Sequence, residues 1–419
     1  MKAVVFHGIG DIRLDEVDEP TLEHPGDAIV QLTASAICGT DLHMVRGTMP
    51  GMRPGTILGH EGVGIVEAIG TGVRNLTLGD RVVIPSTIGC GSCSYCRAGY
   101  YAQCDHANPN GPLAGSAFYG GPGTSGPFHG LQAEKARVPY ANVNLVKLPK
   151  EISDDQAILI SDIFPTGYFG AHLAEIKHGE TVAVFGCGPV GQFAILSARL
   201  LGAGRVLAVD AVPSRLDMAR AQGAEIIDFN AEDPVEVIRE LTGGIGVDRA
   251  IDAVGIDAQC PKLGPAAAAA KKRRRTFKQE LEQVAPEGTS NGQRWHPGNA
   301  PSQALDWAVD ALAKAGTLSI IGVYPETMNF FPIGKAMNKN LSIKMGNCNH
   351  RRYIPLLLEL VQSGVVNPAH VLTQTQPLVS AIEAYETFDH HEPGWMKVRL
   401  DPPGTDSRPP ATAHATGLA

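Results

Sequence analysis

The sequence lacks the features that direct a chain to a membrane, to secretion or to nucleic acid. No apolar run reaches the ~18 residues of a membrane span. Met1–Gly10 has no charged start followed by an apolar core, as a secretory signal would have. Basic residues are not in excess, since 35 lysines and arginines against 43 acidic residues give a net charge of −8. That balance argues against a general nucleic-acid binder. We expect a cytoplasmic protein with no membrane or nucleic-acid partner.

Cysteine is also sparse, at 8 in 419 residues. In a chain without a secretory signal, these cysteines indicate metal ligands or free thiols rather than a disulfide framework. The length is sufficient for two domains with substantial cores.

The most informative stretch runs from Thr181 to Asp210. An apolar, β-branched run over Thr181–Phe185 predicts a buried strand, and the glycine-rich turn GCGPVG follows it directly. Apolar residues then recur at helical spacing from Val190 to Leu201, and a second apolar run, Arg205–Val209, ends on Asp210. A strand, a glycine-rich turn, a helix, a second strand and an acidic residue thus follow one another. This order predicts a dinucleotide-binding βαβ unit.

Each glycine of the turn has a distinct physical role. Gly186 allows the tight turn, Gly188 lets a pyrophosphate approach the backbone, and Gly191 lets helix and strand pack closely. The helix opens at Pro189 and Val190, where free N–H groups and the positive end of the helix dipole favour phosphate binding.

Asp210 indicates which dinucleotide is bound. Its carboxylate would accept hydrogen bonds from the adenosine ribose hydroxyls and repel a 2′-phosphate, so NAD is favoured over NADP. The nearby Arg215 weakens this preference slightly.

Four cysteines in the run GCGSCSYCRAGYYAQC predict a structural zinc site. Their spacing, C-x2-C-x2-C-x7-C, would wrap Cys90, Cys93, Cys96 and Cys104 around one tetrahedral ion. Four thiolates leave no open position, so this site would not be catalytic. An iron–sulfur cluster or four unrelated thiols are the alternatives.

A second group of residues whose side chains can bind a metal is spread along the sequence: Cys38, His60, Glu61 and Asp162. Taken singly, Cys38 could be a core thiol, His60 a hydrogen-bonded core histidine, and Asp162 the N-cap of a helix over residues 166–174. Their combination favours a metal site.

These residues resemble the zinc-containing medium-chain alcohol dehydrogenases. The similarity spans Met1 to about Leu400 and includes CGTDLH from Cys38, GHEGVG from Gly59 with Val66, Gly70 and Val73, and GDRV from Gly79. It implies an α/β fold: a GroES-like β-rich catalytic domain with an inserted doubly wound, parallel-sheet Rossmann domain. The expected boundaries are 1–163 with a zinc lobe at 89–105, 164–345, and a return to the catalytic domain at 346–400.

The resemblance also implies roles for individual residues. Cys38 and His60 would bind a catalytic zinc, Glu61 would approach it, and Asp41 would orient the histidine ligand. Thr40 and His43 would form a proton relay. Thr166 would contact the nicotinamide, and Lys397 would meet the cofactor phosphates.

One position departs from the commonest pattern of this family. Where many members have cysteine as the third zinc ligand, this chain has Asp162 in the pattern SD-x-x-PTG. That pattern resembles the glutathione-independent formaldehyde dehydrogenases and formaldehyde dismutases. A carboxylate keeps the ligand charge but is harder than a thiolate, which favours a more electrophilic zinc. Direct and water-mediated bonding of Asp162 both stay open.

Beyond Asp210, strand and helix patterns alternate. Strands are expected at Glu225–Phe229, Asp248–Val254, Thr317–Val323 and Leu341–Met345, and helices at Ser214–Gln222, Pro234–Leu241 and Gln303–Ala315. With the two strands already described, these make the six strands of a doubly wound sheet. Val254, Ile321 and Val323 would stand at strand ends beside the nicotinamide.

A long segment, residues 256–302, is expected to be an irregular insertion acting as a lid or disordered. Its basic run Lys271–Arg275 is most simply a solvated helical face. The formaldehyde-converting relatives carry an extended loop here over the adenine side of the cofactor, so we hypothesise tightly held NAD. Further on, a helix at Tyr353–Val361, a closing strand at Trp395–Leu400 and a disordered tail at 401–419 are expected.

The expected protein is a zinc-dependent oxidoreductase with two Zn²⁺ per chain and NAD as cofactor. It would transfer hydride between NAD and a small alcohol or aldehyde hydrate, formaldehyde being one candidate. A dehydrogenase of larger secondary alcohols or polyols, and a non-catalytic nucleotide-binding relative, are the alternatives. The resemblance also implies a homo-oligomer, a dimer or a tetramer.

Overall fold

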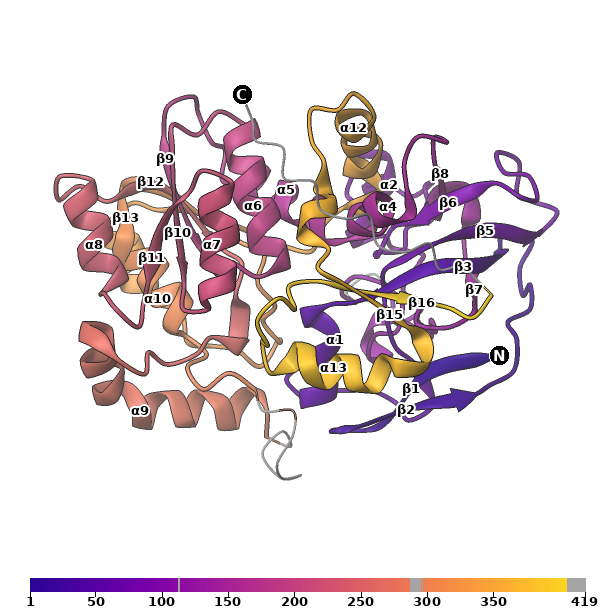
Figure 1. The fold of residues 1–419 in the computed structure, drawn as a ribbon, viewed down its shortest axis with the longest axis horizontal. Helices are drawn as coiled ribbons and strands as arrows, with labels where there is room; N and C mark the ends of the chain where they lie inside the picture. The colour runs from indigo at the N-terminus through magenta and orange to yellow at the C-terminus, as the bar shows by residue number, and fades with distance from the viewer. Residues whose placement is uncertain (112–113, 287–294, 296, 405–419) are drawn as a thin grey trace.

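The computed structural model describes residues 1–111, 114–286, 295 and 297–404, and it has two lobes (Figure 1). The β-rich lobe contains both the first and the last strands of the chain, and the second lobe is formed by the middle of the chain. None of the helices within these described ranges is long and apolar enough to cross a membrane. The expected fold class, a GroES-like lobe with a Rossmann-type lobe, is confirmed.

The β-rich lobe is built on one large sheet and one small sheet. Its strands are β1 (Lys2–Gly8), β2 (Asp11–Glu16), β3 (Ala28–Ile37), β4 (Thr56–Ile57), β5 (Gly62–Ile69), β6 (Arg81–Ile84), β7 (Lys135–Val138), β8 (Val146–Lys147), β15 (Gln374–Pro377) and β16 (Val398–Asp401). The large sheet has the order β15-β16-β3-β5-β6-β8, with β7 paired to β3. Because β16 pairs antiparallel with β3, the end of the chain completes the sheet begun near its start.

Short helices cover this lobe and connect it to the second one. They are α1 (Gly39–Arg46), α2 (Ser94–Arg97), α3 (Ala141–Asn144), α4 (Asp154–Ser161), α5 (Ile163–Leu173), α12 (His350–Gln362) and α13 (Ala381–Asp389), with the 3₁₀ turn η1 (Tyr101–Gln103). Helix α5 packs against the first helix of the second lobe. Gly167 makes this possible, because a Cβ there would lie 2.6 Å from the backbone of Phe193.

The second lobe is a parallel six-stranded sheet between helices. Its strands are β9 (Thr181–Phe185), β10 (Arg205–Asp210), β11 (Glu225–Asp228), β12 (Val247–Asp252), β13 (Leu312–Ile320) and β14 (Ser342–Met345). Its helices are α6 (Pro189–Leu200), α7 (Pro213–Ala221), α8 (Pro234–Leu241), α9 (Gly264–Val284), α10 (Gln303–Ala311) and α11 (Ile333–Asn338). The order β11-β10-β9-β12-β13-β14 is that of a doubly wound dinucleotide-binding sheet.

One element boundary in this lobe differs from the prediction. The helix expected to run to Ala315 ends at Ala311, and β13 begins at Leu312 without an intervening loop. Leu312 already pairs with Val247 of the neighbouring strand. Sheet pairing therefore overrides the helical pattern of these alanine-rich residues.

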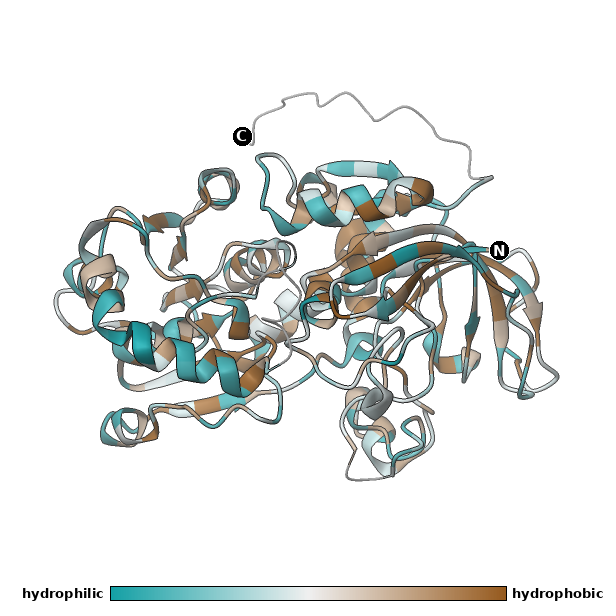
Figure 2. Cartoon of the chain, turned by 90° about the horizontal axis from the view of Figure 1, so that it is seen from below, coloured by the Kyte–Doolittle hydropathy of each residue, from teal (hydrophilic) through white to brown (hydrophobic). Residues whose placement is uncertain are grey.

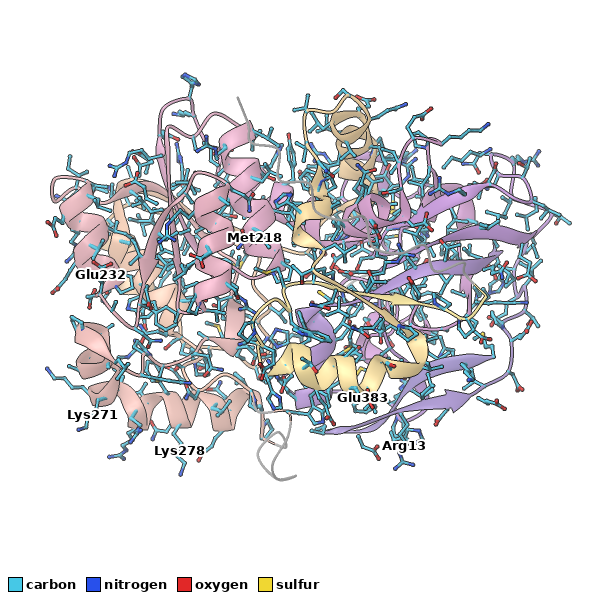
Figure 3. The ribbon with its side chains drawn as sticks, viewed as in Figure 1. Arg13, Met218, Glu232, Lys271, Lys278 and Glu383 are labelled. Carbon is cyan, nitrogen blue, oxygen red and sulfur yellow. The ribbon has the colours of Figure 1, made fainter. Side chains whose placement is uncertain are left out.

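The segment 256–302 is not irregular, as the sequence led us to expect. It holds the 21-residue helix α9, which buries Ala266, Ala270, Phe277 and Val284 along one face. The expected solvated basic face is confirmed, because Lys271, Lys272, Arg274 and Arg275 are exposed. Figure 2 shows α9 as largely hydrophilic from below, and Figure 3 shows Lys271 and Lys278 pointing away from the ribbon. Residues 287–294, 296 and 405–419, the last within the expected tail, lie outside the described residues.

Candidate active site

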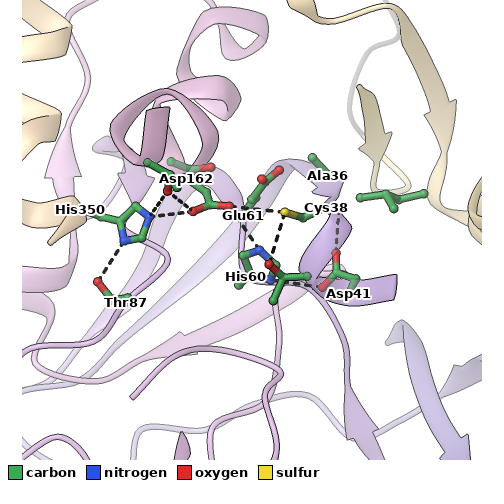
Figure 4. A network of polar contacts seen from close by, with 12 residues as sticks. Ala36, Cys38, Asp41, His60, Glu61, Thr87, Asp162 and His350 are labelled. Carbon is green, nitrogen blue, oxygen red and sulfur yellow. Dashed lines mark hydrogen bonds and ion pairs between the residues drawn. The ribbon is translucent and has the colours of Figure 1, made fainter. Parts of the chain in front are cut away.

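Cys38, His60, Glu61 and Asp162 meet in the β-rich lobe (Figure 4). One ligand atom from each lies within 4.8 Å of the others, and all four side chains are buried. Cys38 follows β3, and His60 and Glu61 immediately precede β5. Since β3 and β5 pair, residues far apart in the sequence are brought side by side.

The separations between donor atoms fit a zinc ion. Asp162 Oδ2 lies 3.3 Å from His60 Nε2 and 3.6 Å from Cys38 Sγ. Tetrahedral Zn²⁺, with bonds of ~2.0 Å to N and O and ~2.3 Å to S, would hold such donors ~3.3 Å and ~3.5 Å apart. A direct bond from Asp162 is thus compatible with the geometry. These three residues would fill three corners and leave one for a substrate.

Asp162 reaches the site because two helices break at it. Helix α4 ends at Ser161 and α5 begins at Ile163, while Asp162 has φ −144° and ψ −68°. Its side chain makes no capping hydrogen bond to α5. Asp162 therefore stands at the N-cap position of α5, but its carboxylate is directed to the other ligands instead of capping the helix.

Asp41 contacts two of the candidate metal ligands, Cys38 and His60. Its Oδ2 accepts a hydrogen bond from the backbone N–H of Cys38 at 2.9 Å and another from Gln132 Nε2 at 3.2 Å. Its Oδ1 lies 3.2 Å from His60 Nδ1. Although burial alone would lower it, the pKa of His60 is raised well above its usual value by Asp41 and Cys38. This arrangement agrees with the predicted orienting role of Asp41.

Glu61 is held by Lys397, which corrects one expectation. Lys397 is fully buried, forms an ion pair with Glu61 Oε2 at 2.5 Å and donates to the carbonyl of Ile37 at 2.9 Å. The interpretation of Lys397 as a contact of the cofactor phosphates is therefore wrong. Glu61 Oε1 has no hydrogen-bond partner among the described residues. Burial raises the pKa of Glu61 to about 8, against the opposing charge of Lys397.

A histidine that the sequence analysis missed completes this site. His350, at the start of α12, places Nε2 at 2.7 Å from Asp162 Oδ1, and Thr166 donates to the same oxygen at 3.1 Å. Although burial would raise it, the pKa of Asp162 is held well below its usual value by His350 and His60. No motif marks His350, which stands 188 residues from Asp162.

Thr40 and His43 lie on α1, which starts beside Cys38. Thr40 Oγ1 is 3.9 Å from Cys38 Sγ. His43 is buried, with Nδ1 2.8 Å from Thr48 Oγ1 and 3.2 Å from Asp257 Oδ2. Burial lowers the pKa of His43. Both residues are near the metal ligands, and their relay role stays a prediction.

The four cysteines of the lobe come together as a second candidate metal site. Their sulfur atoms lie within 4.8 Å of one another, and Cys93 Sγ is 3.9 Å from Cys104 Sγ. Tetrahedral zinc with four ~2.3 Å bonds to sulfur would set this separation near ~3.8 Å. Backbone N–H groups donate to the sulfurs of Cys90, Cys93 and Cys104, as they do around thiolates. None of these four forms a disulfide.

The glycine turn has the predicted geometry of a phosphate cradle. Gly186 has φ +88°, and a Cβ at Gly191 would lie 1.9 Å from the carbonyl of Gly186. A Cβ at Gly188 would meet only Arg215, at 3.8 Å. Gly186 and Gly191 are thus required by the fold itself, whereas Gly188 leaves space beside the N-terminus of α6. A pyrophosphate bound at this helix N-terminus would approach the backbone there.

Asp210 stands at the end of β10, as predicted, and its carboxylate also organises the turn. Oδ2 accepts from the N–H of Cys187 at 2.7 Å, and Oδ1 accepts from Ala211 and Val212 at 2.7 and 2.9 Å. Oδ2 therefore retains a lone pair for a ribose hydroxyl, whereas two N–H donors already occupy both lone pairs of Oδ1. The residue is therefore fixed in place for that contact.

The remaining cofactor candidates lie at the carboxyl ends of β12 and β13. Val254 packs against Gly186, and the N–H of Ile256 donates to the carbonyl of Val323 at 3.0 Å. The N–H of Ile321 donates to the carbonyl of Asp252, also at 3.0 Å. Ligands of doubly wound folds bind at this edge of the sheet.

Comparison with known proteins identifies the family. Residues 24–150 match the alcohol dehydrogenase GroES-like domain, and residues 189–264 match the zinc-binding dehydrogenase family. The chain is 38% identical over 406 residues to the uncharacterized zinc-type alcohol dehydrogenase-like protein AdhB of Bacillus subtilis, covering 96% of this chain and 100% of that protein.

Two further relatives bear on structure and function. The alcohol dehydrogenase TADH from Thermus sp. ATN1 superposes with a TM-score of 0.76 at 35% identity, over 96% of this chain and 100% of that one. The glutathione-independent formaldehyde dehydrogenase of Pseudomonas aeruginosa is 40% identical over 271 residues, 62% of this chain and 66% of that protein. The two clusters of metal-ligand residues and the dinucleotide turn agree with these similarities. The chain therefore belongs to the zinc-type medium-chain alcohol dehydrogenase family.

Proposed function

We propose that the protein catalyses reversible hydride transfer between NAD and a small alcohol or the hydrate of a small aldehyde, formaldehyde included. The observation that carries this proposal is the set of three buried donors, Cys38, His60 and Asp162, with separations that match a zinc site with one open corner. A second zinc would be held by the four-cysteine lobe.

The chemistry divides between the bound groups and the chain. When bound, zinc supplies Lewis acidity that lowers the pKa of a hydroxyl, and NAD⁺ supplies the hydride acceptor. Cys38, His60 and Asp162 hold three ligand positions, and Asp41 fixes the orientation of His60. The fold would supply proximity, because α5, which follows Asp162, packs against α6, which follows the glycine turn.

Thr40 and His43 would remove the proton of the substrate hydroxyl. Thr40 is partly exposed beside Cys38, and its hydroxyl both donates and accepts hydrogen bonds. His43 lies one turn further along α1, and burial lowers its pKa, which favours the neutral ring that a proton acceptor requires. Its Nδ1 is bonded to Thr48, which leaves Nε2 for this role.

NAD rather than NADP is favoured by Asp210, whose fixed carboxylate would accept from ribose hydroxyls and repel a 2′-phosphate. We further propose that NAD is held tightly, as in relatives with an extended loop near the adenine. Protein purified without added cofactor should then carry NAD detectable after acid release. Recovery of cofactor-free protein that exchanges NAD rapidly would contradict tight retention.

A small aldehyde hydrate is a suitable substrate because hydrated formaldehyde has both a hydroxyl and a transferable hydride on one carbon. Its oxidation by NAD⁺ gives formate, NADH and two protons. A second aldehyde could then be reduced by the same NADH, and the sum of both steps is a dismutation. Asp162 and the similarity of part of the chain to a formaldehyde dehydrogenase support this substrate class.

The test combines metal analysis with a substrate panel followed at the absorbance band of NADH. We expect two zinc ions per chain and turnover with small alcohols or formaldehyde. Asp162→Ala should retain one zinc and lose turnover. A single zinc in the wild-type protein would favour a non-catalytic relative. Turnover confined to larger secondary alcohols or polyols would favour the second candidate, and full activity of Asp162→Ala would refute the ligand role.

A further inference from the structure

His350 is a buried imidazole aimed at the carboxylate of the third ligand (Figure 4). It is 3% exposed and is the first residue of α12, in a part of the chain that contributes no metal ligand. Its Nε2 lies 2.7 Å from Asp162 Oδ1 and 3.2 Å from Thr166 Oγ1.

The two oxygens of Asp162 have separate partners. Oδ2 faces the donors of His60 and Cys38, whereas Oδ1 faces His350 and Thr166. An ionised carboxylate oxygen only accepts, and it has two lone pairs. Two donors therefore satisfy Oδ1 fully and leave Oδ2 alone for a metal.

We propose that His350 is a positioning residue that makes Asp162 a one-oxygen ligand and thereby keeps the fourth coordination position open. A carboxylate free to rotate could bind zinc through both oxygens and fill the position that substrate needs. His350, with Thr166, prevents this by holding Oδ1 on the side away from His60 and Cys38. The inference rests on the proposed zinc site. It adds that His350 helps to set how many ligand atoms the protein provides to the metal.

His350 is itself fixed on both sides. Its Nδ1 lies 3.0 Å from Thr87 Oγ1, and that hydroxyl is also 3.2 Å from the carbonyl of Cys348. The adjacent Asn349 accepts a hydrogen bond from the N–H of Ala102, at 2.9 Å, within the four-cysteine lobe. A ring held at both nitrogens has one orientation, which a positioning role requires.

The test uses the full-length protein with Co²⁺ in place of zinc, and compares His350→Leu with His350→Gln. Leucine removes the donor, while glutamine retains an N–H donor on a side chain of similar reach. In His350→Leu, we expect the affinity of the catalytic site for metal to fall about 10- to 100-fold. The visible absorption should weaken, because five-coordinate Co²⁺ absorbs less strongly than four-coordinate Co²⁺. His350→Gln should restore both properties substantially.

Two controls separate positioning from a general loss of structure. His370→Leu changes an exposed histidine and should leave both metal sites unchanged. Thr87→Val removes the partner of Nδ1, together with the hydroxyl contact to the Cys348 carbonyl, and should weaken metal binding at the catalytic site alone, which keeps the proposal testable if His350→Leu does not fold. If wild-type protein binds two ions and both His350→Leu and Thr87→Val keep its affinity and spectrum, this inference is wrong and the proposed function stands. A wild-type protein that binds one ion would instead overturn the proposed function together with this inference.

Discussion

At the scale of single residues, the ion pair of Glu61 and Lys397 places two opposite charges next to the metal ligands. Both side chains are fully buried, and Glu61 adjoins His60 in sequence. A buried ion pair is weak evidence of net stabilisation, because both charges lose their hydration. Removal of one partner, however, leaves the other charge uncompensated in the core.

We therefore predict that Lys397→Met lowers the free energy of unfolding by about 3–5 kcal/mol. Urea denaturation at pH 9, above the pKa of about 8 of Glu61, measures this change. The double variant Lys397→Met/Glu61→Gln should recover most of the loss, because neither charge is then left buried alone. A single variant as stable as the wild-type protein would contradict the assignment of this pair.

The residues of the metal site differ in how far the sequence could predict them. Cys38, His60 and Asp162 each stand in a recognisable local pattern, and the structure brings them together. His350 carries no such pattern, since its partner is supplied entirely by tertiary packing. The prediction for Lys397 was wrong for the same reason, because the position of a residue in the sequence does not show whether its side chain faces the cofactor or the core.

At the scale of elements, α9 is the clearest departure from expectation. The buried residues Ala266, Ala270, Phe277 and Val284 follow helical spacing, but they are small or far apart in a strongly charged run. Neighbouring elements supply the rest of its support. Arg273 pairs with Asp306 of α10, and Ser302 donates to Glu280 at 2.9 Å.

Phe277 is the main apolar anchor of this helix, at 1% exposure and with the guanidinium of Arg273 4.5 Å from its ring centroid. Loss of a buried Phe side chain typically costs about 3–5 kcal/mol. We predict that Phe277→Ala accelerates amide hydrogen exchange in α9 while two zinc ions stay bound. Lys278→Ala, an exposed change on the same helix, is the matched control. Unchanged protection of α9 in Phe277→Ala would contradict this anchoring role.

Apart from β13, the strands of the second lobe begin and end within two residues of their predicted limits, and helix α8 has the predicted limits. The apolar runs of the central strands β9 and β10 are buried on both faces, so they read as continuous hydrophobic segments, and β9 has the predicted limits. The start of β13 was missed because Leu312–Ala315 resembles the end of a helix until its pairing with β12 is known.

At the scale of the whole molecule, charged groups from three distant parts of the chain meet around His391. The nearby charge of Arg215, burial, and the charges of Arg46 and His390 lower the pKa of His391 to about 3, against the opposing charge of Asp257. Because this value is below the ordinary ~6.5, the folded protein keeps His391 neutral where the unfolded chain would take up a proton.

The sign of the pH dependence follows from this difference. The contribution of His391 to stability is complete above about pH 6.5 and is lost progressively as the pH falls toward about 3. We predict that His391→Asn flattens this part of the stability curve, measured as urea midpoints between pH 7.5 and 5. Asparagine tolerates the φ of +54° at this position. Equal losses in both proteins would contradict the assignment.

The edge of the parallel sheet is the surface at which we predict two copies of the chain to associate. Among the residues that the structure describes, strand β14 has a sheet partner on one side only, and the exposed fractions of Met345, Met337 and Ile333 are 62%, 77% and 66%. Unpaired edges with apolar neighbours favour pairing with another chain. We predict a dimer or larger assembly by size-exclusion chromatography with light scattering, which Met345→Lys/Met337→Lys should dissociate. A monomeric wild-type protein would contradict this prediction.

The way the last strand closes the first sheet has a consequence for biosynthesis. The four cysteines of the zinc lobe lie within one short run, so they emerge from the ribosome together and are ready for metal early. The other ligand set is finished only when His350, Lys397 and β16 have been translated, since these support Asp162, Glu61 and β3. Nascent chains should therefore acquire their two ions in sequence, and a chain truncated before β16 would carry the first without the second.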